Sequence, residues 1–167
     1  MSKTKSFIFK GKQSFSSSKL EQIKHEFNKL NHLDTEIYSN EIYLILADAD
    51  SINLDGIKDV LSATEHDEEF SFYIGPRIGT ISPWSSKATD ILANAGFDSL
   101  RRIEKGLCFS LDAQLDLEKN STKEIGLKIY DQMTQSVITN ISKAESLFEQ
   151  RQPKPVLEVD IVGKGKK

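Results

Sequence analysis

The segment 79–90, which reads GTISPWSSKATD, contains residues that could form an anion site. Ser82 followed by Pro83 is typical of a helix N-cap with proline at the first helical position, where the missing N–H costs nothing. More hydroxyls and a cation surround this predicted helix start: Thr80, Ser85, Ser86 and Lys87. Free backbone N–H groups, hydroxyls and a lysine at a helix N-terminus can bind an anion, most naturally phosphate. A serine-rich cap beside a buried Trp84 explains the same residues without any ligand.

Arginines lie close to this segment along the chain. Three of the four arginines fall near Trp84 in the sequence, namely Arg77, Arg101 and Arg102. The planar guanidinium suits phosphate and carboxylate groups better than the ammonium of lysine does. These side chains therefore either serve an anion site or pair with carboxylates on the surface of a sheet.

The composition argues against several other functions. The net charge is −3, so no overall basic field favours nucleic acid or an anionic membrane. Neither phosphate-loop pattern, G-x-x-x-x-G-K-[ST] or G-x-G-x-x-G, occurs. Cys108 is the only cysteine and lies in an apolar run, which favours a buried thiol and leaves no cysteine metal cluster. Without a membrane-length apolar run or a secretory core, a cytoplasmic protein is expected, and no metal site is predicted.

The spacing of apolar residues divides most of the chain into alternating strands and helices. Alternation of period two predicts strands at 7–9, 36–46, 70–74 and 100–111. Spacing of three and four residues predicts helices over 20–30, 54–61 and 88–95. The last strand is interrupted at 104–106, which indicates either a hairpin or a bulge.

A long helix is predicted to follow, because Ser121 and Glu124 form a capping box. Its apolar stripe is expected to face the sheet and consists of Ile125, Ile129, Met133, Val137 and Ile141. These elements predict an α/β (α+β) two-layer sandwich, with a mixed or mostly antiparallel sheet packed by helices. Each half holds two strands and two helices, which is compatible with a duplicated unit.

Residues 1–150 are predicted to form one α/β domain, and residues 151–167 differ from them in character. Pro153-Lys154-Pro155 breaks regular structure, and the short apolar run LEVDIV and a lysine-rich end follow. This end is either an edge strand or tail of the domain, or the start of a linker to a further domain.

A long motif in the middle of the chain resembles a known family. PRIGTISPWSSKATDIL, followed closely by RRIEKG, is similar to the signature of the large, single-chain form of phosphoribosylformylglycinamidine synthase, also called formylglycinamide ribonucleotide amidotransferase. The matching positions are Arg77, 79–91, Arg102, Glu104 and Gly106. The end QPKPVLEVDIVGKG also resembles the stretch that leads from the family's N-terminal domain into its linker. The first 65 residues resemble the family only in the order and length of their elements.

The resemblance implies a part in a purine-pathway ligase that uses ATP and the ammonia of glutamine to convert formylglycinamide ribonucleotide to its amidine. The family's ATP and Mg²⁺ site and its glutaminase belong to later domains, so the resemblance implies no catalytic residue, cofactor or metal in this chain. The N-terminal domain is similar to a dimer of the separate small subunit of multi-subunit enzymes. It packs on the synthetase domain and helps to wall off ammonia and to shape the ribonucleotide site.

Applied to this chain, the resemblance identifies a surface for the substrate or for the synthetase and glutaminase domains. The expected contacts are Thr80, Ser82, Ser85, Ser86 and Lys87, with Arg77 and Arg102 as supporting or phosphate-binding residues. Trp84 is expected to anchor the loop by packing. Two other functions stay open on the residues alone: a free-standing adaptor that docks on a protein through this loop, and a regulatory domain that binds a phosphate ligand there.

Overall fold

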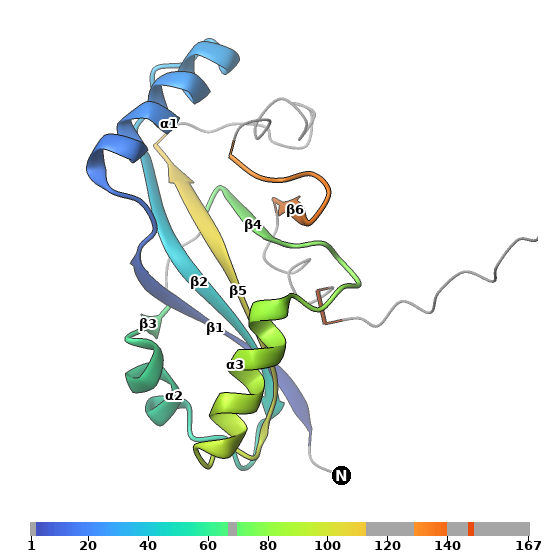
Figure 1. Ribbon diagram of the computed structural model, residues 1–167. Helices are drawn as coiled ribbons and strands as arrows, with labels where there is room; N and C mark the ends of the chain where they lie inside the picture. The colour runs from blue at the N-terminus through green and yellow to red at the C-terminus, as the bar shows by residue number, and fades with distance from the viewer. Residues whose placement is uncertain (1–2, 67–69, 113–128, 140–146, 149–167) are drawn as a thin grey trace, which may run out of the picture.

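The computed structural model describes residues 3–66, 70–112, 129–139 and 147–148. In this part of the chain six strands form one antiparallel sheet, in the order β3-β1-β2-β5-β4-β6 (Figure 1). The strands are β1 (Thr4–Gln13), β2 (Ile37–Asp48), β3 (Thr64–Glu65), β4 (Phe72–Pro76), β5 (Leu100–Leu111) and β6 (Gln135–Ile138). The helices are α1 (Ser17–Asn31), α2 (Leu54–Leu61) and α3 (Pro83–Asn94).

Each of the first two helices begins at a side chain that caps it. The Ser16 hydroxyl accepts a hydrogen bond from the Lys19 backbone N–H at 3.4 Å, and the side-chain Oδ1 of Asn53 accepts one from the Gly56 backbone N–H at 3.0 Å. Such caps satisfy N–H groups that have no partner inside the helix. The predicted helix starts near 20 and 54 are therefore confirmed.

The three helices cover one face of the sheet, α1 at one end and α2 and α3 at the other (Figure 1). Alternation along β2 shows why. Tyr43, Ile45 and Ala47 point to the helix face and pack with α2 and α3, whereas Ile42 and Leu44 belong to a separate cluster on the other face. Apolar residues on both faces are typical of a central strand. The predicted two-layer α+β sandwich with a mostly antiparallel sheet is confirmed, and the duplicated unit stays a prediction.

Strand β5 is continuous, so the predicted interruption at 104–106 is wrong. Glu104, Lys105 and Gly106 each pair with a residue of β2. The register shift lies further back, where Leu46 pairs with Arg102 but Ala47 pairs with Leu100. One extra residue on one strand of a pair is the arrangement of a β-bulge. The charged residues Glu104 and Lys105 thus lie within a continuous strand and do not mark a break in it.

The predicted helix through 129–137 is also wrong. Val137 lies in β6, and the Met133 side chain is 81% exposed in a turn, so the stripe does not face the sheet as a helix. The Asp131 carboxylate accepts hydrogen bonds from the Met133 N–H at 2.9 Å and from the Thr134 hydroxyl at 2.8 Å. Such local bonds offer the backbone an alternative to a helix. Ile125 and Ile141 lie outside the described residues.

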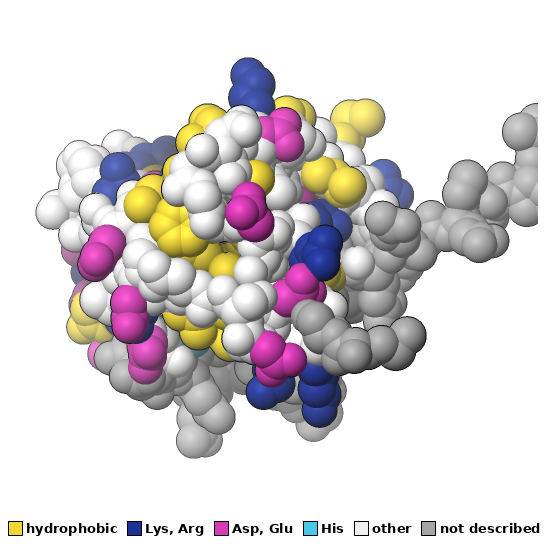
Figure 2. Space-filling view, turned by 90° about the horizontal axis from the view of Figure 1, so that it is seen from below, with side chains coloured by type: hydrophobic (Ala, Val, Ile, Leu, Met, Phe, Trp, Pro, Cys, Tyr) yellow, Lys and Arg dark blue, Asp and Glu magenta, His cyan; other side chains and the backbone are white. Residues whose placement is uncertain are grey.

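Charged side chains of both signs lie on the face seen from below. Carboxylate and cationic side chains are interspersed there, and the described residues form no basic patch on this face (Figure 2). None of the described helices has the length and apolar character that a membrane crossing requires.

Candidate functional site

The start of α3 is built as the sequence predicts. After β4 ends at Pro76, a loop carries Gly79 at a φ of 84°, a left-handed conformation that favours glycine. The Ser82 hydroxyl accepts a hydrogen bond from the Ser85 N–H at 3.0 Å, and Pro83 occupies the first turn. The predicted N-cap at Ser82 is confirmed.

The carboxylate of Glu104 lies against this helix start. The Ser82 N–H donates to Glu104 Oε1 at 3.2 Å, and the Ser82 hydroxyl donates to Glu104 Oε2 at 2.7 Å. The Glu104 side chain is 0% exposed. A helix N-terminus favours negative charge, and here the protein supplies that charge itself. An external phosphate therefore meets a site already filled by Glu104 at the N-cap.

Arg102 fastens the preceding loop to the same strand. Its guanidinium donates to Glu104 Oε1 from Nε at 3.1 Å, and to the Thr80 carbonyl oxygen at 2.7 Å. The guanidinium carbon also lies 5.4 Å from the centroid of the Phe148 ring. With only 12% of the side chain exposed, the guanidinium is engaged inside the domain. The sequence allows this arginine either to serve an anion site or to pair with a carboxylate, and the structure shows the pairing, with Glu104.

The side chains of the first turn of α3 point in two directions. Ser85 is fully buried, and its hydroxyl has no hydrogen-bond partner among the described residues. Ser86 and Lys87 are exposed, and Lys87 forms no ion pair with any residue that the structure describes. Trp84 is 37% exposed, with its ring centroid 6.1 Å from that of Tyr43. We call Trp84, Ser86 and Lys87 the outer α3 surface; Ser85 does not belong to it.

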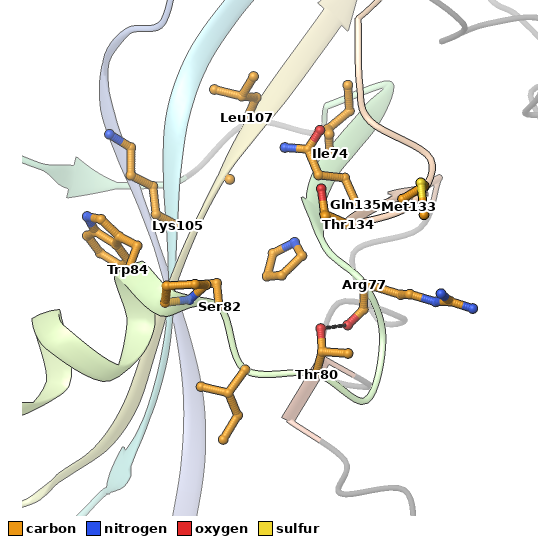
Figure 3. A pocket seen from close by; sticks show the side chains of 14 residues that line it. Ile74, Arg77, Thr80, Ser82, Trp84, Lys105, Leu107, Met133, Thr134 and Gln135 are labelled. Carbon is orange, nitrogen blue, oxygen red and sulfur yellow. Dashed lines mark hydrogen bonds between the residues drawn. The ribbon is translucent and has the colours of Figure 1, made fainter.

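Arg77 and Thr80 lie on the loop before the helix. The Thr80 hydroxyl donates to the Arg77 carbonyl oxygen at 2.6 Å, and the Arg77 N–H donates to the Thr134 carbonyl oxygen at 3.0 Å (Figure 3). The Arg77 side chain points away from the cavity that the loop borders (Figure 3). Thr80 thus stabilises the turn, and Arg77 presents its cation to the outside.

A cavity opens where β4 leaves β5. The two strands pair only from Phe72 to Ile74, whereas the other edge of β4 pairs with β6 from Tyr73 to Pro76. The opening has a volume of about 680 Å³, and its walls come from β4, β5, the start of α3 and the turn before β6 (Figure 3). Its rim includes the exposed apolar side chains Ile81, Trp84 and Met133. Exposed large apolar side chains around a hollow are typical of a contact surface for another molecule.

A polar group lies on the helix face of the sheet. One side of it is the apolar cluster that packs against α2 and α3, and the other side is the cluster that packs against α1. Glu41 accepts hydrogen bonds from Lys105 Nζ at 2.7 Å and from the Tyr43 hydroxyl at 2.9 Å. Burial alone would raise the pKa of Glu41, but the bonds from Lys105 and Tyr43 outweigh it and hold the pKa below its ordinary value. Burial, together with the hydrogen bond to Glu41, raises the pKa of Tyr43 to about 12. Glu41 is thus held as a carboxylate and Tyr43 as a neutral phenol beside Trp84.

The remaining expectations concern metals and Cys108. In the described ranges, no group of three or more His, Cys, Asp or Glu side chains could hold a metal ion. Cys108 is buried, in the cluster on the face opposite the helices, as its apolar neighbours predict. Arg101 pairs with Asp48 at 2.5 Å, away from the α3 start.

The sequence prediction misses two features of the site. It gives Glu104 no role, although Glu104 lies two residues after Arg102, which puts both on one face of a strand. It also counts Ser85 among the contacts to a partner, whereas Ser85 is buried. Helical spacing could have placed it inside, since Ser85, Ala88 and Leu92 share a face, and Ala88 and Leu92 pack in the core.

The family model described as formylglycinamide ribonucleotide amidotransferase N-terminal matches residues 27–148. The match spans β2 to β6 together with the α3 start, Glu104 and Arg102.

Proposed function

This chain belongs to the family of formylglycinamide ribonucleotide amidotransferase N-terminal domains, and from that premise we propose that it is a non-catalytic domain of that enzyme. The family places the chain in an amidotransferase of purine biosynthesis. In the proposed role, the domain packs against the synthetase domain and helps to form the ribonucleotide site and a closed passage for ammonia. Such a passage keeps ammonia away from solvent, where it would be protonated and lost.

The observation that carries the proposal is the outer α3 surface within the matched region. Lys87 and Ser86 present a cation and a hydroxyl to the outside, and Trp84 of the same surface lines the cavity with the apolar rim. An exposed lysine with no ion pair in the described part of the chain can neutralise a phosphate or a carboxylate of a neighbour. The proposed partners are therefore the synthetase and glutaminase domains and formylglycinamide ribonucleotide.

Glu104 argues against a phosphate-binding regulatory domain as the second candidate. The most favourable anion position at the helix start is taken by its carboxylate. Among the residues that the structure describes, no group of three or more His, Cys, Asp or Glu side chains could hold a metal ion. We place ATP and Mg²⁺ in another domain of the enzyme, and no step of the reaction is assigned to this chain.

The purified chain of 167 residues is expected to show no glutaminase, ATPase or amidotransferase activity. The physical reason is that the proposed role is packing and shaping, and Cys108 is buried among apolar residues where a thiolate is disfavoured. The measurement is ammonia release from glutamine and phosphate release from ATP. Turnover that co-purifies with the chain and survives repeated chromatography would contradict the proposal.

The proposal is tested by Lys87→Ala and Ser86→Ala in the full-length enzyme, assayed with saturating ATP and with ammonia in place of glutamine. Loss of a charge-assisted hydrogen bond to the ribonucleotide is worth about 1.5–3 kcal/mol, so KM for the ribonucleotide is expected to rise by about 10- to 150-fold. Lys29→Ala is the matched control, because Lys29 is an exposed lysine near the end of α1.

Each outcome decides between the roles. A raised KM with ammonia supports a substrate contact. Normal kinetics with ammonia and a loss only with glutamine would move the surface to the ammonia passage or the contact between domains. Wild-type kinetics of both variants in every assay would show that the segment only caps the helix, and would contradict the proposed function.

A further inference from the structure

We infer that Glu104 and Arg102 are positioning residues, which hold the start of α3 so that the outer α3 surface faces its partner in the enzyme. The inference rests on the proposed function, and it assigns a role to two residues whose side chains are almost entirely buried in the domain. Its evidence is the way in which a buried ion pair on β5 fastens a loop at two points.

The first point is Ser82. Both of its polar groups, the backbone N–H and the hydroxyl, donate to the Glu104 carboxylate, one to each oxygen. The helix itself needs only the Ser82 hydroxyl as acceptor for the Ser85 N–H. A fully buried carboxylate is costly, and an apolar residue of similar size often serves stability as well or better. The contribution of Glu104 is therefore best explained as fixing where the cap lies relative to β5.

The second point is Thr80. Arg102 lies two residues before Glu104 on the same face of β5, and it reaches the Thr80 carbonyl oxygen at 2.7 Å while pairing with Glu104. Thr80 and Ser82 are thus fixed to positions two residues apart on one strand. Two anchors define the direction in which the chain enters the helix, whereas a single anchor would leave it free to swing.

The surroundings explain why anchors are needed at this place. Beyond Ile74, strand β4 no longer pairs with β5, and the loop lies along the part of β5 that β4 has left. A third contact to β5 follows about two turns after Ser82, where the Thr89 hydroxyl accepts a hydrogen bond from the Ile103 N–H at 3.2 Å. The first turn of α3, which carries Trp84, Ser86 and Lys87, is the part that depends on the ion pair.

The test uses Glu104→Gln and Arg102→Lys, each made in the full-length enzyme and in the chain of 167 residues. Glutamine keeps the shape but loses the charge, and lysine keeps the charge but cannot reach Glu104 and Thr80 as a fork. Trp84 is the only tryptophan of the chain, so its emission reports the position of the first turn directly. Ile57→Val, in the core under α2, is the control for a general loss of stability.

We expect both variants to shift the Trp84 emission of the folded chain and to lower kcat/KM for the ribonucleotide by about tenfold or more, the loss of one charge-assisted hydrogen bond. Ile57→Val is expected to lower Tm and to change neither readout. Ser82→Ala removes the hydroxyl bond to Glu104 and keeps the bond from the backbone N–H, so Glu104→Gln is expected to cost less activity in a Ser82→Ala background than in the wild type. If one variant fails to fold, the other carries the test.

The inference is overturned if the folded variants keep wild-type emission and kinetics, or if the emission shifts while kinetics stay normal and Lys87→Ala is defective. Failure of the proposed function looks different. In that case Lys87→Ala and Ser86→Ala are normal in every assay, while the shift of Trp84 emission still shows that the ion pair positions the helix start.

Discussion

Replacement of Gly106 by alanine is expected to lower the free energy of unfolding by about 3 kcal/mol, the upper range for overpacking a core. A Cβ at this position would lie 2.3 Å from the Tyr73 ring and 2.5 Å from the Ile74 carbonyl oxygen. The phenol of Tyr73 is fully buried and lies across this point of β5, so it has no room to move aside. The carbonyl belongs to the short pairing of β4 with β5 and cannot rotate away without breaking it.

Urea unfolding followed by circular dichroism measures this cost, with the slope of the transition checked for constancy. Ser110→Ala is the matched control, since Ser110 is a half-buried residue of the same strand and points to the same face as Gly106. Its cost is expected to stay within about 0.5 kcal/mol, as for substitutions that break no special feature. A Gly106→Ala variant as stable as the control would show that the close approach of Tyr73 is not a constraint.

Phe72→Ala is expected to cost about 3–5 kcal/mol, the range for removal of a buried aromatic ring. The Phe72 ring stacks on Phe109 with centroids 4.8 Å apart, and on Phe27 with centroids 6.3 Å apart. It therefore joins α1, β4 and β5 in one cluster. A cavity there removes contacts from all three elements at once.

Thermal and urea unfolding of Phe72→Ala and Phe72→Leu give the comparison. Leucine fills most of the space, so a cost of about 1–2 kcal/mol is expected for Phe72→Leu. Equal costs for the two variants would contradict the stacking role, because the penalty would then not depend on the volume removed.

Local signals predicted a large part of the fold. The strand expected at 36–46 is observed at Ile37–Asp48, and the helix expected at 54–61 is observed at Leu54–Leu61. Both have a strong physical signature: apolar residues on both faces of a central strand, and an asparagine cap before an apolar stripe. Where pattern and capping agree, tertiary contacts only reinforce the local preference.

The errors arose where the same residues suit two structures. Ile129, Met133 and Val137 have helical spacing, yet the Asp131 side chain stabilises a turn and Val137 enters β6. The pairing of β6 with β4 depends on residues far away in the sequence, which no local pattern reveals. The interruption expected at 104–106 failed for a related reason, because a buried glutamate in a strand makes sense only once Ser82 and Arg102 are placed beside it.

The candidate site was predicted in outline and not in its orientation. The cap at Ser82 and its proline follow from the sequence. The packing of α3 on β5 turns Ser85 inward and leaves Ser86 and Lys87 outside, and the helical spacing of Ser85 with Leu92 is the local signal for it. The roles of those two residues stay a prediction until the substitutions are made.

The pairing of β2 with β5 has a consequence for the order in which the domain folds. Ala47 meets Leu100 only after the whole segment that contains α2, β3, β4 and α3 has been made, and the same two strands carry residues of all three core clusters. Contacts between residues so distant in sequence require a large loop to close before they stabilise anything. The antiparallel pairing of β1 with β2 spans a shorter stretch and can form earlier, as the nascent chain lengthens. Until β5 has been synthesised and has paired, one edge of β2 has no hydrogen-bonding partner strand. The chain is then most prone to associate with other chains through this edge.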